Sequence, residues 1–182
     1  MTEKEKMLKG MIYDANNDPR LIAECKELCH DYNHLRPKDV EGRRKIIMEL
    51  LGSVKGNFLI EQPFLCDYGY NIHIGDNFYA NHNLVILDGA TVKFGDNVFV
   101  APNCGFYTAG HPIDAAERNK GLEYARPITV GNDVWIGGNV CVLPGVTIGD
   151  DCVIGAGSVV VKDIPPHSVA VGNPCKVIKK IK

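Results

Sequence analysis

The chain has 182 residues and a net charge of −2 at pH 7, and 45% of its residues are hydrophobic. This length suffices for one domain with a sizeable core, and the nearly balanced charge disfavours a protein that binds nucleic acid through a basic surface. The sequence shows no charged-then-apolar leader and no apolar stretch near membrane-spanning length, so we expect a cytoplasmic protein without a membrane partner.

The seven cysteines are odd in number and include no pair separated by two residues. Cys25 and Cys29 share one face of an expected helix, and Cys141 and Cys152 lie in the repeat described below. We therefore expect buried free thiols in a reducing compartment rather than disulfides. Metal binding is the poorer interpretation of these cysteines, because no partners with ligand spacing accompany them.

Residues 1–55 are predicted to form a helical cap. Thr2 and Glu5 have the spacing of a capping box, which predicts a first helix. Asp18 as N-cap and Pro19 as the first helical residue predict a second, and residues 38–51 a third. The apolar positions of the second and third helices are Leu21, Ile22, Cys25, Leu28, Cys29, Tyr32, Val40, Ile46, Ile47, Leu50 and Leu51.

Residues 56–182 are predicted to form a stack of coils, because their sequence repeats every six residues. A period of six fits neither a helix nor a lone strand. Each unit makes one short strand and one corner, three units close a triangular coil, and the aliphatic column fills its interior. That column is Val130, Ile136, Val142, Ile148, Ile154 and Val160, and the second column is Val134, Val140, Val146, Cys152, Ser158 and Ile164.

The repeat is interrupted once by a long segment. Weaker copies begin at Ile74 and Phe94, the repeat stops at Thr108–Arg126, and it resumes at Ile128. We expect an extended loop at about 108–127 with a functional role, because long loops on rigid scaffolds commonly carry function. Near the end, Lys162–Pro166 is expected to break the repeat, followed by a partial return and a basic tail.

Several phrases occur in a specific order: Asn77–Asn81, Ala101–Asn103, Ala109–Pro112, Glu123–Ile128, Asn132–Gly138 and Gly172–Cys175. Together with the helical N-terminal segment, they resemble the maltose and galactoside O-acetyltransferases, a family of hexapeptide-repeat acyltransferases, over nearly the whole chain. The resemblance implies a mainly β fold, a left-handed parallel β-helix of hexapeptide repeats with an N-terminal α-helical cap. The handedness comes from the resemblance alone.

The resemblance also implies an activity and an assembly. The expected reaction transfers an acetyl group from acetyl-CoA to a hydroxyl of a glucose-like, maltose-like or galactoside sugar. No metal is expected to be required, and the transfer is expected to be direct, within a ternary complex. The family implies a homotrimer whose active sites are shared between two subunits.

The family's catalytic histidine falls at His111, where it would act as general base, a role that suits imidazole. Glu123 is a candidate to orient it through the other ring nitrogen, although a solvated loop charge is the simpler interpretation. On the acceptor side the resemblance places Asn81, Tyr79 and Asp14, with Asp67, Tyr68 and Asp88 as weaker candidates. Galactoside-type members often carry a serine at the position of Asp67, which argues against a galactoside acceptor.

On the donor side the resemblance places Trp135, Gly137, Gly138 and Ala156 beside the pantetheine arm of coenzyme A. Small residues there let the arm approach the backbone, although corner geometry alone also explains the glycines. Phosphate groups would meet lysines, for which the candidates are Lys162, Lys176, Lys179 and Lys180.

Three alternatives remain open from the sequence. The first is a hexapeptide-repeat acetyltransferase with another acceptor, such as a serine, an amino-sugar or an antibiotic. The second is a gamma-type carbonic anhydrase, which needs three zinc-binding histidines, whereas His73, His82 and His111 are far apart in the sequence. The third is a non-catalytic scaffold, which has no need of the phrases around Asn81, His111 and Trp135.

Overall fold

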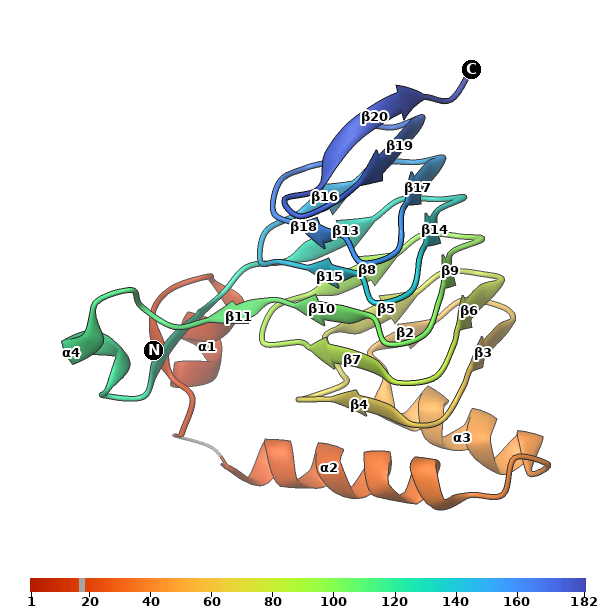
Figure 1. The fold of residues 1–182 in the computed structure, drawn as a ribbon. Helices are drawn as coiled ribbons and strands as arrows, with labels where there is room; N and C mark the ends of the chain where they lie inside the picture. The colour runs from red at the N-terminus through yellow and green to blue at the C-terminus, as the bar shows by residue number, and fades with distance from the viewer. Residues whose placement is uncertain (17–18) are drawn as a thin grey trace.

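Three helices come first along the chain, and two of them, α2 and α3, lie across one end of a stack of triangular coils (Figure 1). The computed structural model describes residues 1–16 and 19–182. The helices are α1 (Glu3–Leu8), α2 (Pro19–His34) and α3 (Val40–Leu50). None of the helices in these residues is long and apolar enough to cross a bilayer.

The helix signals in the sequence are largely confirmed. Thr2 accepts a hydrogen bond from the Glu5 backbone, and the Glu5 carboxylate accepts one from the Thr2 backbone, which completes the predicted capping box. The predicted N-cap Asp18 lies outside the described residues. Helix α3 begins directly after its N-cap Asp39, and Val40, which we assigned to the apolar side, is exposed.

Helices α2 and α3 close the lower end of the core. Their buried side chains belong to the same hydrophobic cluster as the first coil and include Cys25, Cys29, Tyr32, Ile47 and Leu50. Because helices and coils share this core, the division into two units at residue 55 remains a prediction.

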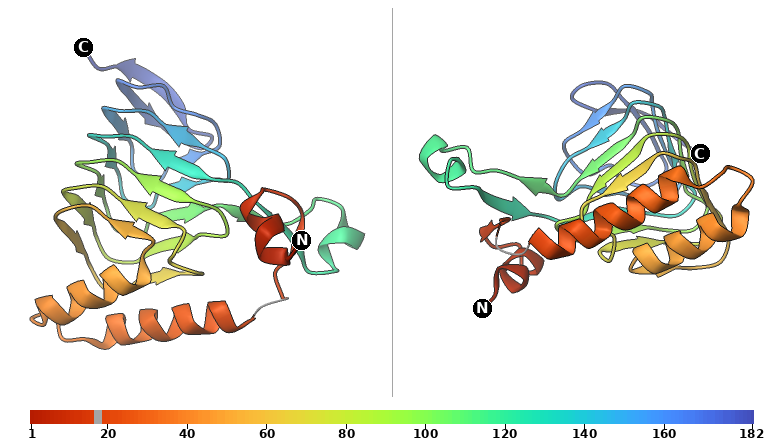
Figure 2. Two further views of the ribbon diagram at one scale, coloured as in Figure 1. Left: turned by 180° about the vertical axis from the view of Figure 1, so that it is seen from behind. Right: turned by 90° about the horizontal axis from the view of Figure 1, so that it is seen from below.

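Each coil has three sides, and equivalent sides stack into three faces (Figures 1 and 2). Face A consists of β2 (Ser53–Val54), β5 (Ile72–Ile74), β8 (Val92–Phe94), β13 (Ile128–Val130) and β16 (Thr147–Ile148). Face B consists of β3 (Phe58–Ile60), β6 (Phe78–Ala80), β9 (Phe99–Val100), β14 (Trp135–Ile136), β17 (Cys152–Ile154), β19 (Ser168–Val171) and β20 (Lys176–Lys180). Face C consists of β4 (Phe64–Cys66), β7 (Leu84–Leu87), β10 (Gly105–Tyr107), β15 (Cys141–Val142) and β18 (Val159–Val160).

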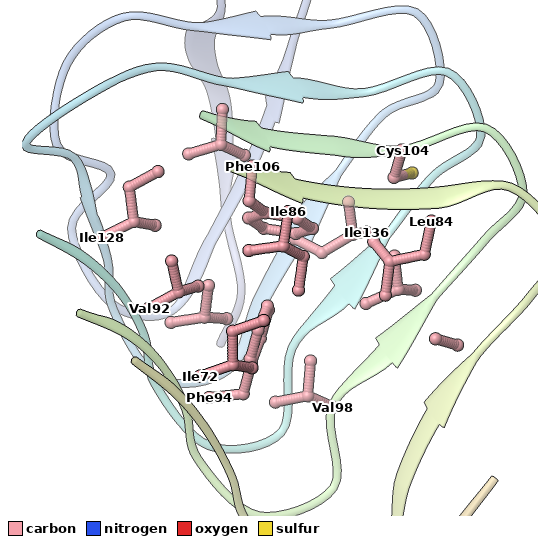
Figure 3. Close-up of a cluster of buried hydrophobic side chains, with 14 of the residues drawn as sticks. Ile72, Leu84, Ile86, Val92, Phe94, Val98, Cys104, Phe106, Ile128 and Ile136 are labelled. Atoms are coloured by element: carbon pink, nitrogen blue, oxygen red, sulfur yellow. The ribbon is translucent and has the colours of Figure 1, made fainter. Parts of the chain in front are cut away.

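The chain visits the faces in the order A, B, C, so the structure has three stacked corners, which we call AB, BC and CA. The predicted aliphatic column fills the interior, with each member at most 1% exposed. Aromatic rings fill the coils below it, where the ring centroid of Phe94 lies 4.9 Å from that of Phe106 (Figure 3). The ring centroid of Phe94 also lies 5.0 Å from that of Phe78. The six-residue period therefore predicts the core correctly.

Corner AB shows why Asn and Asp recur in the repeat. Asn77, Asn97 and Asp133 all have positive φ, which asparagine and aspartate tolerate better than most residues. Their side chains also form a ladder, because Asn77 donates to Asn97 over 2.9 Å and Asn97 donates to Asp133 over 2.8 Å. The corner residues thus both permit the turn and tie successive coils together.

The C-terminal end confirms one prediction and adds a strand that we did not predict. Ile164 bridges Ile148, 16 positions earlier on face A, whereas Thr147 pairs with Thr129, 18 positions earlier, so the six-residue step breaks at Lys162–Pro166 as predicted while the stack itself continues. The basic tail forms strand β20, which pairs antiparallel with β19 and closes the upper end of face B. A period-based reading misses this strand because its partner runs in the opposite direction.

The interruption of the repeat projects from corner CA (Figure 2). It consists of β11 (Ala109–Gly110), the short helix α4 (Ala115–Arg118) and β12 (Leu122–Ala125). Strand β12 pairs antiparallel with β11 on one side and with β1 (Tyr13–Asp14) on the other. This three-stranded sheet, which we call the arm sheet, brings the N-terminal segment beside the loop that carries His111.

Candidate active site

His111 follows β11 directly, and β11 is an edge strand of the arm sheet. Its Nδ1 lies 3.0 Å from the backbone carbonyl oxygen of Leu122 on the neighbouring strand. Because a carbonyl oxygen only accepts, this contact places the proton of the neutral ring on Nδ1 and leaves a lone pair on Nε2. The side chain is 52% exposed, so Nε2 is accessible to a bound alcohol.

Glu123 faces the same ring but does not orient it. Its Oε1 lies 3.8 Å from His111 Nε2, which is too long for a hydrogen bond. Its Oε2 accepts a 2.7 Å hydrogen bond from the hydroxyl of Tyr13, which lies opposite Glu123 in the pairing of β1 with β12. The ring is therefore oriented by the Leu122 carbonyl, and Glu123 is a fixed, half-buried charge rather than the solvated loop charge of the simpler interpretation.

Tyr13, like Tyr70 below, is a site residue that our sequence analysis missed. It is only 3% exposed, and burial together with the hydrogen bond to Glu123 raises its pKa. The tyrosine therefore stays protonated and donates to the carboxylate. It lies 110 residues from Glu123 in the sequence, so only the pairing of β1 with the arm sheet reveals the contact.

Asp14 lines a small hollow of about 30 Å³ between α1, β1 and the first coil, together with Tyr13, Tyr68 and Tyr70. The Asp14 carboxylate accepts a 2.9 Å hydrogen bond from the Asn16 backbone, while Glu3 accepts from the Asp14 backbone over 2.7 Å. The arrangement combines a held carboxylate with three aromatic rings. Such a combination suits a ligand with both hydroxyl groups and apolar C–H faces.

Asp67 and Asp88 form the adjacent part of corner CA. Asp88 is fully buried, and its Oδ1 accepts from the backbone of Asp67 over 3.1 Å and of Tyr68 over 2.9 Å. Burial first, and then the charges of Asp88 and Glu123, raise the pKa of Asp67 to about 6. Asp67 is half-buried, whereas Asp88 supports the turn from below.

The other predicted residues, apart from Lys162, lie on face B and at corner BC, away from the arm sheet. Asn81 follows β6 at corner BC, where its side-chain oxygen accepts from the His82 backbone over 2.7 Å. Gly137, Gly138 and Ala156 occupy the same corner in the coils above. His111 and Asn81 therefore belong to different corners of one chain.

The two predicted glycines differ in what holds them. A Cβ on Gly137 would lie 2.6 Å from the Ala156 backbone nitrogen, so stacking of the coils requires glycine there. A Cβ on Gly138 would meet nothing closer than the Pro102 oxygen at 3.5 Å, an ordinary contact. Corner geometry thus explains Gly137 but not Gly138, whose missing side chain leaves space at the surface.

Face B presents a row of large outward side chains. The pairing registers align Leu59, Tyr79, Phe99 and Trp135, followed by Val153 and Val169 in the upper coils. Trp135 is 57% exposed, so it is not a core residue. Lys179 pairs with Val169 at the upper end of this row, and Lys176 lies on the same strand.

Lys162 is separate from those lysines. It follows β18 and is exposed at corner CA, the corner that also carries Asp67, Asp88 and the arm sheet. The predicted site residues therefore fall into two groups. The CA group is His111, Asp14, Asp67, Asp88 and Lys162, and the BC group is Asn81, Tyr79, Trp135, Gly137, Gly138, Ala156, Lys176 and Lys179.

The three histidines considered for a zinc site lie in three different places within the chain. His73 bonds to Ser53 on face A, and His82 bonds to the Gln62 carbonyl at corner BC. His111 stands on the arm sheet beyond corner CA. These positions give the carbonic anhydrase alternative no convergent ligand set within one described chain.

Comparison with known proteins gives matches to two family models. Residues 6–56 match the maltose acetyltransferase hexapeptide capping motif, and residues 127–162 match the bacterial transferase hexapeptide model of six repeats. The first covers the helical segment and the second the most regular part of the stack.

Individual proteins match over nearly their whole length. The chain is 53% identical over 181 residues to the galactoside O-acetyltransferase of Escherichia coli, covering 100% of this chain and 89% of that protein. It is 54% identical, with a TM-score of 0.99, to the structure of a maltose O-acetyltransferase from Clostridium difficile, with 100% and 98% covered. A galactoside acetyltransferase in complex with coenzyme A is 47% identical with a TM-score of 0.97, and 100% and 92% are covered.

The matched spans extend well beyond the repeat itself. They include the helical segment and the arm sheet, which unrelated hexapeptide-repeat stacks do not need in order to form a core. The chain therefore belongs to the maltose and galactoside O-acetyltransferase family of hexapeptide-repeat acyltransferases, and its fold is their left-handed parallel β-helix.

Proposed function

We propose that this protein transfers the acetyl group of acetyl-CoA to a hydroxyl of a small sugar, with His111 as general base. The observation that carries the proposal is the contact of His111 Nδ1 with the Leu122 carbonyl, which leaves Nε2 as the acceptor of a proton. Leu122 pairs with Asp14, which lines the hollow of carboxylate and aromatic groups.

In the proposed reaction the sugar oxygen attacks the thioester carbonyl carbon while its proton passes to His111 Nε2. Collapse of the tetrahedral adduct releases the thiolate, which takes the proton from the His111 imidazolium and leaves as the free thiol. Glu123, 3.8 Å from Nε2, stabilises the transient imidazolium by charge. Tyr13 holds that carboxylate in place through its 2.7 Å hydrogen bond.

The acceptor side of the proposal is the hollow at corner CA. Asp14 accepts hydrogen bonds from sugar hydroxyls, and Tyr68 and Tyr70 pack against C–H faces of the ring. Asp67 is a further acceptor of hydrogen bonds, whereas Asp88 positions Asp67 and Tyr68 because its own carboxylate is buried. A glucose-like or maltose-like acceptor fits this set.

The donor side is the row of face B and the edge of corner BC. Trp135 offers an exposed aromatic face, and the space at Gly138 admits a narrow chain such as the pantetheine arm. Lys176 and Lys179 lie at the upper end of the row for the phosphates, and Ala156 adds a small residue at the same corner. Asn81 completes the proposed site with both a donor and an acceptor.

The two groups meet if three copies assemble about an axis. Face C lies between corners BC and CA. Leu65 on β4 and Val161, which directly follows β18, are 50% and 40% exposed there. If three copies turn this apolar face toward a common axis, corner CA of one copy meets corner BC of the next. We propose a homotrimer in which each active site combines His111 of one subunit with Asn81 and Trp135 of another.

A thiol-release assay with acetyl-CoA and a panel of acceptors tests the proposed function. The panel contains glucose, maltose, a galactoside, glucosamine, serine and an aminoglycoside. We expect the highest kcat/KM with glucose or maltose, and an O-acetylated product by mass spectrometry and NMR. Turnover with only serine or an amino group would overturn the sugar hydroxyl as acceptor, and no thiol release with any acceptor would overturn the enzyme assignment.

A further inference from the structure

Three cysteines that lie far apart in the sequence meet beneath the first coil. Cys25 and Cys29 are one turn apart on α2, and Cys66 is the last residue of β4. The Sγ atom of Cys66 lies 3.5 Å from that of Cys25 and 3.8 Å from that of Cys29. All three thiols are free, buried, and within 4.8 Å of one another.

This spacing matches a shared metal ion better than a disulfide. A Zn–S bond of about 2.3 Å in tetrahedral geometry separates two ligand sulfurs by about 3.8 Å. A disulfide needs about 2.05 Å between its sulfurs and uses only two of the three. An ion at the centre of the cluster engages all three sulfurs close to their present positions.

The surroundings give the cluster a neighbouring groove and a favourable charge. Cys29 and Cys66 form part of the wall of a groove of about 540 Å³ between α2 and face C. Asp67 and Asp88 lie near enough to interact electrostatically with Cys29 and Cys25, respectively. A cation in the cluster is therefore favoured by two neighbouring carboxyls.

We propose that Cys25, Cys29 and Cys66 bind one thiophilic cation, Zn²⁺ or Cu⁺, as a three-thiolate site. Thiolates are the ligands that select these ions. Binding displaces the thiol protons to solvent and transfers no electrons, and water or a small thiol in the groove completes the coordination of Zn²⁺. The ion fastens α2 to the end of β4, directly before Asp67, and takes no part in acetyl transfer.

Metal titration of the full-length, reduced, chelator-treated protein tests the site. Zn²⁺ is titrated against a chromophoric chelator, and Cu⁺ is titrated anaerobically against a Cu⁺-specific chelator. We expect one ion per chain for at least one metal, and a melting temperature that rises with its concentration. Cys66→Ser and Cys25→Ala should each lose the ion, whereas Cys141→Ser, on face C outside the cluster, should bind as the wild type does.

X-ray absorption of the metal-loaded wild type provides a second readout that needs no variant to fold. Three sulfur neighbours at about 2.3 Å for Zn²⁺ support the proposal. A spectrum of nitrogen and oxygen neighbours alone overturns it, as does an ion that both variants retain. The proposal is also overturned if the folded, reduced wild type binds neither ion. This holds even if mild oxidation of the same protein joins two of the three thiols.

Discussion

The two corners that carry the proposed site are built in opposite ways. Corner BC is part of the stack itself, where Gly137 is required by the backbone of the coil above it. Corner CA carries an added sheet, in which β1 and β12 come from opposite halves of the chain. The repeat provides a rigid surface, whereas the proposed general base is placed by the segment that departs from the repeat.

Replacing His111 by alanine should produce the largest change in activity. Loss of the proposed general base should lower kcat by about 10²–10⁴-fold, while the circular dichroism spectrum, melting temperature and oligomeric state stay unchanged, because the exposed side chain contributes nothing to the stack. The check is steady-state kinetics with acetyl-CoA and the best sugar. Wild-type turnover by this variant would remove His111 from the mechanism.

The glycines at corner BC separate stacking from binding. Gly137→Ala should lower the free energy of unfolding by about 1–3 kcal/mol, because the added methyl group meets the backbone of the next coil. Gly138→Ala is the matched control, since its methyl group makes only an ordinary contact. We expect unchanged stability and a raised KM for acetyl-CoA in Gly138→Ala. Urea unfolding measures the stability, and steady-state kinetics at varied acetyl-CoA concentration measure the KM. Equal destabilisation by the two changes would contradict the distinction.

The Asn81→Ala change should affect the acceptor more than the donor. Removing one hydrogen bond to a bound sugar should lower kcat/KM for the sugar about tenfold, with little change in the dissociation constant of acetyl-CoA. Isothermal titration with acetyl-CoA and kinetics at varied sugar concentration check this. An equal loss on both sides would place Asn81 outside the acceptor site.

The Tyr13→Phe variant tests whether the hydrogen bond between Tyr13 and Glu123 supports His111. The variant keeps the ring but leaves Glu123 without its 2.7 Å hydrogen bond, so the carboxylate holds the imidazolium less well. We expect kcat to fall about tenfold with a change in the pH profile of kcat, and an unchanged KM for acetyl-CoA. A Glu123→Gln variant with the same pH profile as Tyr13→Phe would support the shared role, whereas a wild-type profile in Tyr13→Phe would contradict it.

The smallest expected effect concerns Asp67. Its pKa of about 6 lies above the ordinary value of 3.8, mainly because of burial. The folded state therefore binds more protons than the unfolded state between pH about 4 and 6, so this group makes stability fall as pH rises through that window. Asp67→Asn should flatten that part of the profile of stability against pH. Melting temperatures measured from about pH 3.5 to about pH 7 give this profile. An unchanged profile would contradict the raised pKa.

The sequence predicted the stack well and the arm sheet poorly, for a physical reason. Aliphatic residues six apart point to one interior because each unit repeats the same local geometry, so the column from Val130 to Val160 follows from spacing alone. The contacts of His111 with Leu122 and of Glu123 with Tyr13 depend on antiparallel pairing between distant segments, which no local period records. The meeting of Cys66 with Cys25 and Cys29 depends on how α2 docks beneath the first coil, which is also a long-range property.

The division of the candidate site between two corners has one direct test, in which His111→Ala and Asn81→Ala subunits are co-expressed in equal amounts and purified together without separating assemblies by composition. If each active site takes its histidine from one subunit and its asparagine from the next, a random mixture contains intact sites at about a quarter of its interfaces. We therefore predict about a quarter of wild-type turnover on a sugar at low concentration, compared with about a tenth for Asn81→Ala alone and far less for His111→Ala alone. Mixed assemblies no more active than the better parent would contradict the account.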